Sequence, residues 1–329
     1  MSWPLERSSS PVITVGISSC LLGEEVRYNG THKRSAFCTE VLSGLFSFVS
    51  ICPEVAIGMG TPRDPIQLVS NSVSDSTIRV KGVLDKRVDV TDALVSYAEK
   101  QARKQANVCG YVFMDRSPSC GLYGVKRHTP DGSVLDTTRG IYADTFTKIH
   151  PLLPVEEAGR LDDEALRINF IIRVLTYHDW QQFLASEISA KGLIEFHARY
   201  KYLVMAHSDQ HYKSIGRLLS DLKNQNLTQV AQKYIRQLMD ALSKPATPKQ
   251  HTNTLMHIQG YLKKLISGED KEKLNQVIAH YHQGRLAITA PMMLLKQHLE
   301  THKNVNQYAY NQVYLNTLPY ELGLKQHTN

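Results

Sequence analysis

Residues 12–20 of this 329-residue chain read VITVGISSC, an apolar and β-branched run that ends at a cysteine. The arrangement recurs twice: SFVSICPE carries an apolar run to Cys52, and YVFMDRSPSCG carries another to Cys120. Short apolar runs bounded by turn residues are typical of buried strands. The pattern therefore predicts three strands, each with a cysteine at or just past its C-terminal end.

The first half of the chain alternates such runs with helical patterns. Alternating strands and helices favour an α/β fold with a mainly parallel, Rossmann-like sheet. The C-terminal ends of parallel strands share one edge, where ligands bind, so we expect the three thiols to converge there. Strands are expected at Val12–Ile17, Phe48–Cys52, Thr77–Val83 and Gly110–Met114, and helices at Ser35–Phe46 and Thr91–Gln105.

The composition changes near residue 151, where HPLLPVEEAGRLDDEAL holds two prolines and a cluster of acids. The sequence after it shows helical patterns and almost no strands. The chain length also favours two domains. We therefore predict an α/β domain at residues 1–155 and an all-α domain at residues 156–329. Helices are expected at Asp163–Ala185, Gly192–Met205, Ser208–Leu222, Leu227–Leu242, Pro248–Ser267, Lys271–Gln283 and Ala290–Lys303.

The formal net charge of +7 is unevenly distributed. Residues 1–155 hold 17 Lys and Arg against 15 Asp and Glu, whereas residues 165–329 hold 20 against 11. A basic half beside a nearly neutral half favours a catalytic domain joined to a polyanion-binding domain. A solvated basic surface with no such partner is the alternative.

The stretch FHARYKYLVMAHSDQHYKSIGR interleaves basic and aromatic residues. Basic side chains contact phosphates, and aromatic rings stack on unpaired bases, so this stretch predicts RNA binding. An ordinary amphipathic helix pair, with its tyrosines packed inward, is the alternative. The residues expected to bind RNA are Arg199, Lys201, Lys213 and Arg217, among Tyr200, Tyr202 and Tyr212.

Five cysteines at wide spacing, without an export signal, argue against a disulfide framework. The N-terminus lacks the apolar core of a signal peptide, and the uncharged stretches are too short or too polar to span a bilayer. We therefore expect a cytoplasmic protein. Cys38 lies within an expected helix and Cys109 at the start of an expected strand, so both are predicted to be small core residues.

Three converging thiolates, from Cys20, Cys52 and Cys120, can hold either zinc or an iron–sulfur cluster. An all-thiolate set suits soft metals, and three thiolates on a cubane leave one iron open. The alternative is that the three cysteines are buried and bind no ligand.

Polar residues flank two of these cysteines. Glu54, two residues after Cys52, is expected to act as a general acid or base, or else to start a helix or form a salt bridge. Ser117 and Ser119 precede Cys120 and can position a water or a substrate carbonyl, or cap a turn. Arg63 stands in the loop GMGTPRDP, which favours contact with an anion.

The motifs SSCLLGEEVRYNG, CPEVAIGMGTPRDP and SPSCG together resemble the thiouracil desulfidase (TudS) family over residues 12–155. The second half resembles the helical domain that some relatives carry, as in the two-domain tRNA 4-thiouridine desulfidases (RudS). The resemblance implies a 4Fe–4S cluster held by Cys20, Cys52 and Cys120, whose fourth iron binds the substrate sulfur. It also implies catalytic roles for Glu54 and Ser117.

The implied reaction is a non-redox cleavage of a carbon–sulfur bond that converts 4-thiouridine in tRNA to uridine and releases sulfide. Two other functions remain open. One is an RNA-binding protein with a structural zinc or an inert cluster, and the other is a desulfidase of free thiobases or thionucleosides. No obligate protein partner is expected.

Overall fold

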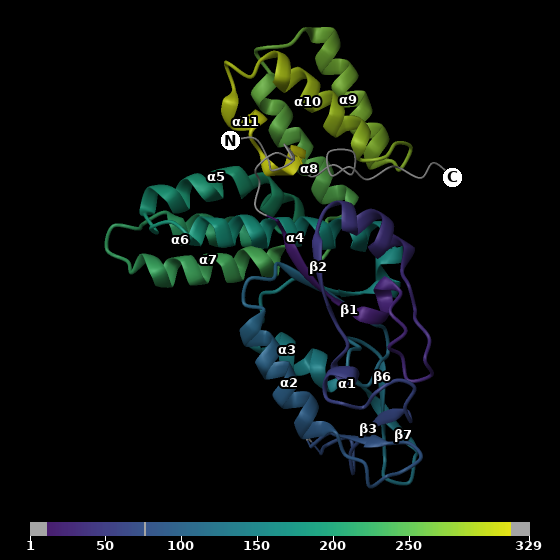
Figure 1. Ribbon diagram of the computed structural model, residues 1–329. Helices are drawn as coiled ribbons and strands as arrows, with labels where there is room; N and C mark the ends of the chain where they lie inside the picture. Colours follow the sequence, from purple (N-terminus) through teal and green to yellow (C-terminus); the bar gives the residue numbers. More distant parts are fainter. Residues whose placement is uncertain (1–11, 76, 317–329) are drawn as a thin grey trace. The chain divides into compact units, whose positions relative to one another are not determined.

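The computed structural model describes residues 12–75 and 77–316 (Figure 1). The chain divides into two compact units, which comprise residues 12–177 and residues 178–316 of the described chain. The division falls within a long helix, α4 (Glu164–Leu184). The domain bounds drawn from the sequence, residues 1–155 for catalysis and residues 156–329 for RNA binding, stay a prediction.

The first unit contains a parallel four-stranded sheet in the order β2-β1-β5-β8. The prediction of an α/β fold with a parallel sheet is confirmed. Three of the expected strands form its centre and one edge, each displaced by a residue or two. The strands are β1 (Thr14–Ser18), β2 (Ser47–Ile51), β5 (Gly110–Phe113) and β8 (Val155–Glu157).

A glycine in the middle of β1 makes room for the aromatic core. Gly16 pairs with Tyr111 of β5, and a Cβ built on Gly16 would lie 2.3 Å from Cδ2 of that ring. The Tyr111 ring is fully buried and stacks on Phe113, with ring centroids 4.0 Å apart. A side chain at Gly16 would therefore displace the largest buried ring of the sheet.

A second four-stranded sheet has the order β4-β3-β6-β7. Strand β3 is parallel to β6, whereas the β3–β4 and β6–β7 pairs are antiparallel. Only β4 corresponds to an expected strand. The strands are β3 (Ile66–Val69), β4 (Arg79–Gly82), β6 (Val125–His128) and β7 (Val134–Thr138).

Helix α2 (Thr91–Lys104) packs against both sheets. Its Leu94 belongs to an apolar cluster with Leu68 and Val80 of the second sheet, whereas Ala98 and Ala102 belong to the cluster around Tyr111 and Phe113. Helix α3 (Ile141–Ile149) lies beside α2 (Figure 1). The expected helix Thr91–Gln105 is thus confirmed to within one residue, and it links the two halves of the core.

The expected helix at Ser35–Phe46 is wrong in detail. The structure has a π-helical turn at Phe37–Val41 followed by a 3-10 turn at Leu42–Gly44. The Thr39 hydroxyl donates to the Ser35 carbonyl oxygen at 3.0 Å, and the Ser43 hydroxyl to the Thr39 carbonyl oxygen at 2.7 Å. Such side-chain hydrogen bonds compete with the regular backbone hydrogen bonds of an α-helix and distort the helix.

The second unit is helical, as predicted. Its core contains Trp180, Phe196 and Tyr234, whose rings contact one another at centroid distances of 5.2 to 5.9 Å. In the described residues, no helix is long and apolar enough to cross a membrane. After α4 the helices are α5 (Ala190–His207), α6 (Asp209–Leu219), α7 (Leu227–Ala241), α8 (Pro248–Gln259), α9 (Gly268–His282), α10 (Thr289–Thr301) and α11 (Gln307–Tyr310).

Candidate active site

A cavity of about 290 Å³ lies at the C-terminal edge of the parallel sheet. The segments that follow β1, β2 and β5 each contribute a cysteine to its wall, and the loop after α1 (Pro53–Ala56) contributes Arg63. The structure thus brings to one place the residues that the sequence singled out for catalysis and metal binding: Cys20, Cys52, Glu54, Ser117 and Cys120.

Each cysteine of the cavity is placed by the end of a strand. Cys20 lies in the 3-10 turn Ser19–Leu22 directly after β1, and Cys52 is the N-cap residue of α1 directly after β2. Cys120 lies in the loop after β5 and is buried. All are free thiols. Cys38 and Cys109 are buried in the core and do not line the cavity, as expected of small core residues.

Burial keeps these thiols protonated. It raises the pKa of Cys20 to about 11, with the neighbouring Cys52 adding to the rise. It also raises the pKa values of Cys52 and Cys120, and Glu54 raises both further. A bound cationic metal centre would reverse this preference, because it stabilises thiolates directly. In the described chain, no group of three or more His, Cys, Asp or Glu side chains is close enough to hold a single metal ion.

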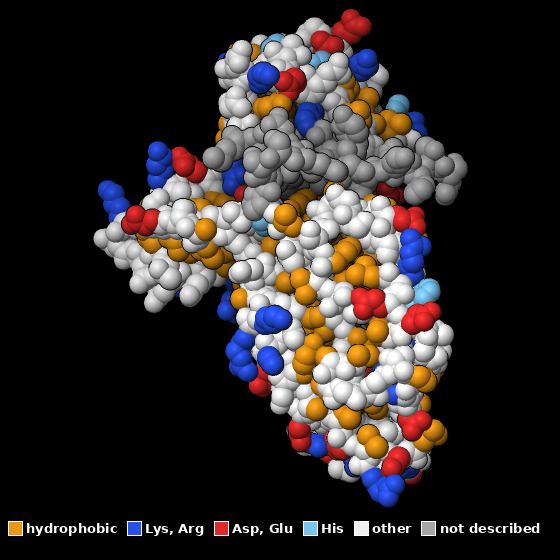
Figure 2. Space-filling view, in the orientation of Figure 1, with side chains coloured by type: hydrophobic (Ala, Val, Ile, Leu, Met, Phe, Trp, Pro, Cys, Tyr) orange, Lys and Arg blue, Asp and Glu red, His pale blue; other side chains and the backbone are white. Residues whose placement is uncertain are grey.

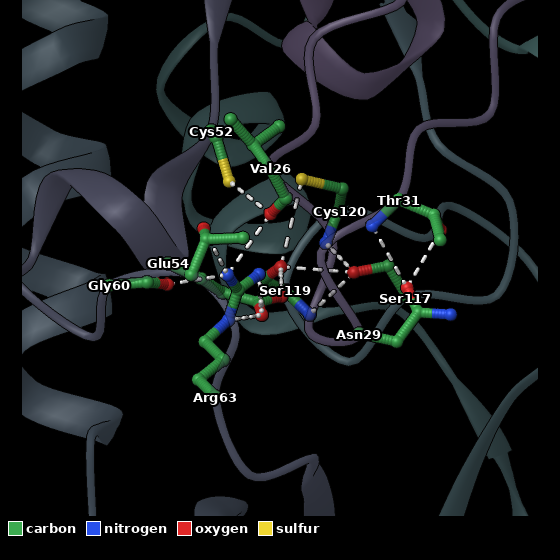
Figure 3. A network of polar contacts seen from close by, with 11 residues as sticks. Val26, Asn29, Thr31, Cys52, Glu54, Gly60, Arg63, Ser117, Ser119 and Cys120 are labelled. Atoms are coloured by element: carbon green, nitrogen blue, oxygen red, sulfur yellow. Dashed lines mark hydrogen bonds and ion pairs between the residues drawn. The ribbon is translucent and has the colours of Figure 1, made fainter.

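Glu54 forms a buried ion pair with Arg63 in the wall of the cavity (Figure 3). Nε and Nη2 of Arg63 donate to Oε2 of Glu54 at 2.9 and 2.7 Å. The side chains of Arg63 and Glu54 are only 5% and 11% exposed. Both the catalytic and the salt-bridging interpretations of Glu54 therefore stay compatible with its position, and the anion that Arg63 contacts is this carboxylate.

Two serines extend from the other oxygen of Glu54. The Ser119 hydroxyl donates to Oε1 of Glu54 at 2.6 Å, and Oγ of Ser117 lies 3.0 Å from Oγ of Ser119. Because Ser119 has one proton and gives it to the carboxylate, Ser117 must be the donor in the second bond. Oγ of Ser117 in turn accepts the backbone N–H of Cys120 at 3.1 Å. The result is an ordered chain from Ser117 through Ser119 to Glu54.

Arg63 also ties together the loops that carry the cysteines. Its Nη1 donates to the carbonyl oxygens of Val26 and Gly60 at 3.0 and 2.9 Å. The Val26 carbonyl oxygen also accepts a weak bond from Sγ of Cys52 at 3.7 Å (Figure 3). The sequence analysis singled out Ser119 and Arg63 as neighbours of the site, but the network that joins them to Glu54 appears only in the structure.

The loop that carries Ser117 and Cys120 rests on the N-terminus of α3. The backbone N–H of Ile141 donates to the Pro118 carbonyl oxygen at 3.0 Å. A Cβ built on Gly140, the N-cap residue, would lie 2.6 Å from the Ser119 carbonyl oxygen and 2.7 Å from that of Ser117. Glycine is therefore required at residue 140 for this close approach.

We expect Gly140→Ala to displace the serine loop, because backbone atoms cannot yield as a flexible side chain does. Overpacking of this kind costs about 1–3 kcal/mol in the free energy of unfolding. Chemical denaturation measures that loss, and activity should fall with it. The control is Gly268→Ala in α9, where nothing lies within 4 Å of the added Cβ. Equal stability of the two variants would contradict the prediction.

A buried carboxylate that the sequence analysis did not select fixes the far end of the same loop. Oε1 of Glu157 accepts the backbone N–H groups of Leu122 and Tyr123 at 2.8 and 3.0 Å. Burial raises the pKa of Glu157. In the sequence, Glu157 belongs to an acidic segment of the kind that is usually exposed to solvent. The short strand β8 has no run of apolar residues that would have predicted its burial.

In the second unit, three of the four residues predicted to bind RNA line one cavity of about 740 Å³. They are Lys201 of α5 and Lys213 and Arg217 of α6, together with the ring of Tyr212. Lys213 and Arg217 lie one helical turn apart, as their spacing indicated. Figure 2 shows Lys and Arg side chains interspersed with Asp and Glu on both units. The residues that line this cavity therefore locate a basic site more narrowly than the net charge of the chain does.

The fourth residue, Arg199, does not line that cavity. Its guanidinium donates to Oδ2 of Asp179 at 2.9 Å and lies over the rings of Phe196 and Tyr200. Tyr200 and Tyr202 are buried, so of the tyrosines considered for stacking only Tyr212 lines the basic cavity. For Tyr200 and Tyr202, packing into the core is the interpretation that fits.

Comparison with known proteins matches each half of the chain to a family. The family described as 2-thiouracil desulfurase matches residues 15–158. A second, described as a protein of unknown function (DUF1722), matches residues 201–319.

Two curated bacterial proteins are similar to the chain. Uncharacterized protein YbgA of Escherichia coli (strain K12) is 32% identical over 141 residues, which cover 43% of this chain and 80% of YbgA. Uncharacterized protein YbbK of Bacillus subtilis (strain 168) is 33% identical over 110 residues, which cover 32% of this chain and 71% of YbbK. A solved structure described as a 4Fe–4S-dependent thiouracil desulfidase, TudS, has a TM-score of 0.37 and 25% identity, covering 47% of this chain and 97% of its own.

Proposed function

Because the chain belongs to the 2-thiouracil desulfurase family through residues 15–158, we propose that it converts 4-thiouridine in tRNA to uridine. Family membership indicates a desulfidase, an enzyme that cleaves a carbon–sulfur bond. In the proposed reaction the oxygen of water replaces the sulfur on carbon 4 of the base, sulfide leaves, and no electrons are gained or lost. The observation that carries the proposal is the single cavity lined by three cysteines, Glu54 and Ser117.

The residues of the cavity fit a 4Fe–4S cluster held by Cys20, Cys52 and Cys120. Three free thiols line one space, and of the described residues that line it none is a histidine, which catalytic zinc sites commonly use. A cluster with three thiolate ligands, when bound, supplies an open iron that is a Lewis acid suited to a soft thiocarbonyl sulfur.

The chain's own residues hold and move the proton. The carboxylate of Glu54 is fixed by Arg63 and can accept a proton from the attacking water, either directly or through Ser119 and Ser117. Ser117 is held by two backbone N–H groups and can orient the water or the base. Each of these groups already contacts the next, so little rearrangement of the side chains is needed for the proton to move.

The helical unit supports tRNA as the substrate. Its cavity brings Lys201, Lys213 and Arg217 together around Tyr212, and of the described residues that line it none is acidic. Burial, together with the neighbouring Lys201, lowers the pKa of His197 in its wall to about 4, so this imidazole is neutral near pH 7. Phosphate contacts by lysine and arginine supply most of the non-specific affinity for RNA.

We expect the double variant Lys213→Glu, Arg217→Glu to bind tRNA at least about tenfold more weakly and with a smaller dependence on salt. Two positive charges at the cavity become negative, so fewer counterions are released on binding. Filter binding between low and physiological salt measures both effects. The matched control is Lys273→Glu, an exposed residue of α9 that does not line the cavity. Unchanged affinity of the double variant would contradict an RNA site here.

The direct test of the function is anaerobic. Iron and sulfide are quantified in the purified protein, which is then incubated with bulk tRNA while the near-ultraviolet absorption of 4-thiouridine is followed. We expect the absorption to disappear as sulfide accumulates. A colourless protein that contains zinc, or an iron–sulfur protein that leaves the absorption unchanged, would overturn the proposal in favour of RNA binding alone.

A second candidate is a desulfidase of free thiobases, because the family that matches the first half is described by 2-thiouracil. Parallel turnover of 2-thiouracil, 4-thiouridine and thiolated tRNA separates the two candidates. We expect tRNA to have the highest kcat/KM, because only tRNA can also contact the basic cavity of the helical unit.

A further inference from the structure

A second basic cavity adjoins the catalytic one within the first unit. It has a volume of about 340 Å³ and shares Ile66, Arg116 and Pro118 with the catalytic cavity. Lys126 and His128 of β6 also line it. Of the described residues that line it, none is acidic. The two cavities thus lie side by side, and the cation of Arg116 borders both of them.

Both cations of this cavity are available to a ligand. Within the described chain, neither Arg116 nor Lys126 has a side-chain hydrogen bond or ion pair, and both are exposed. Buried Arg127 between Lys126 and His128 differs, since it is paired with Asp136 at 2.6 Å on the opposite face of the sheet. The alternation along β6 thus separates the structural Arg127 from the exposed and unpaired Lys126.

Arg116 has an unusual backbone conformation. Its φ is 52°, which makes it the one residue other than glycine with a positive φ in the described chain. This conformation costs about 1 kcal/mol for a residue with a Cβ, and such strain gathers at functional sites. Here it occurs directly before Ser117, within the segment 114–120 that lines the catalytic cavity. Arg116 itself lines both cavities.

A third cavity continues the path across the second sheet. It has a volume of about 220 Å³, shares Gln67 with the second cavity, and is lined by Lys81 and Lys86. The register places Lys81 beside Gln67, and Lys126 beside Thr137, on the face opposite the apolar core. Polar and basic groups thus form a row across β4, β3, β6 and β7. A row suits an extended polyanion better than an isolated anion.

We propose that this path binds the sugar–phosphate backbone next to the thiolated nucleotide, with Arg116 and Lys126 on the nearest phosphate. The inference rests on the proposed desulfidase function and extends it, because it assigns backbone recognition to the catalytic unit as well as to the helical unit. In this arrangement, a nucleotide whose base enters the catalytic cavity would place its phosphate in the second cavity, which shares Arg116 with the first. Arginine and lysine are the residues that bind phosphate most strongly.

The test compares 4-thiouridine, 4-thiouridine 5′-monophosphate and a short single-stranded RNA with one 4-thiouridine, all with the intact protein. In Arg116→Gln and, separately, Lys126→Gln, we expect the ratio of kcat/KM for the phosphate-bearing substrates to that for the nucleoside to fall about tenfold. The matched control is Lys100→Gln, an exposed residue of α2 that lines none of these cavities. The same ratio in the wild type and both variants would overturn the proposal.

Binding measured without turnover keeps the two proposals distinguishable. Fluorescence anisotropy of a labelled single-stranded RNA that lacks thiolation should show weaker binding and a smaller salt dependence in both variants than in the Lys100→Gln control. Loss of turnover on all three substrates in the wild type would end the desulfidase proposal, while the anisotropy would still decide the backbone site. A loss in the mononucleotide ratio alone, with unchanged RNA binding, would overturn the path and leave a free-nucleotide phosphate site.

Discussion

Glu54→Gln should reduce kcat about 10²- to 10⁴-fold, the usual contribution of a positioned general acid or base. Glutamine keeps the shape of the side chain and can accept the hydrogen bond from Ser119, but it cannot take up a proton near neutral pH. It also leaves the buried guanidinium of Arg63 without its anion. Steady-state turnover on 4-thiouridine in tRNA measures the effect, and iron content should remain that of the wild type.

Loss of an ion pair lowers stability as well as activity, so a matched variant is needed. Breaking a buried pair by removing one partner costs about 3–5 kcal/mol in the free energy of unfolding. Asp136→Asn removes the partner of another buried arginine, Arg127, in the second sheet and outside the catalytic cavity. We expect it to lower stability but not kcat. If both variants lose turnover in proportion to their stability, Glu54 has only a structural role.

Replacement of Cys20, Cys52 or Cys120 by alanine should remove the bound iron and abolish turnover. Each variant deletes a direct ligand of the proposed cluster, whereas loss of residues behind a metal ligand already costs about 10–100-fold in affinity or activity. Iron, sulfide and the visible absorption of the anaerobically purified variants measure the loss. All three positions should behave alike, because a cluster with two remaining protein ligands is poorly held.

The chain supplies its own control for thiol loss. Cys38 and Cys109 are buried cysteines of the same unit that lie outside the catalytic cavity. Cys38→Ala and Cys109→Ala should lose some stability through poorer packing and keep both iron and turnover. Iron retained in Cys20→Ala, Cys52→Ala and Cys120→Ala, or lost equally in all five variants, would contradict the proposed ligand set.

The sequence predicted those elements whose residues carry a strong apolar or helical pattern. The strands β1 and β5 are buried apolar runs, β2 is an apolar run that is only partly buried, and α2 has regular helical spacing, so each was found to within a few residues. The strands β3, β6, β7 and β8 were not predicted. β6 reads VKRH and β8 reads VEE, so their charged residues conceal strands that are fixed by pairing and buried hydrogen bonds.

The meeting of the cysteines followed from topology, because the C-terminal ends of parallel strands share an edge. The partners of Glu54 could not be predicted in the same way. Arg63 is nine residues away in a loop rich in glycine and proline, and Ser119 is 65 residues away. No periodic pattern fixes the path of such loops, so only the tertiary structure shows that they meet at one carboxylate.

Helix α2 should make the two sheets of the first unit unfold together. Because Leu94 packs with one sheet and Ala98 and Ala102 with the other, neither sheet can lose its cover without exposing apolar surface of both. We therefore expect calorimetry to record the two sheets as a single cooperative transition. A proteolytic nick within 91–104 should release both together, whereas fragments split between the sheets should not keep their structure in isolation.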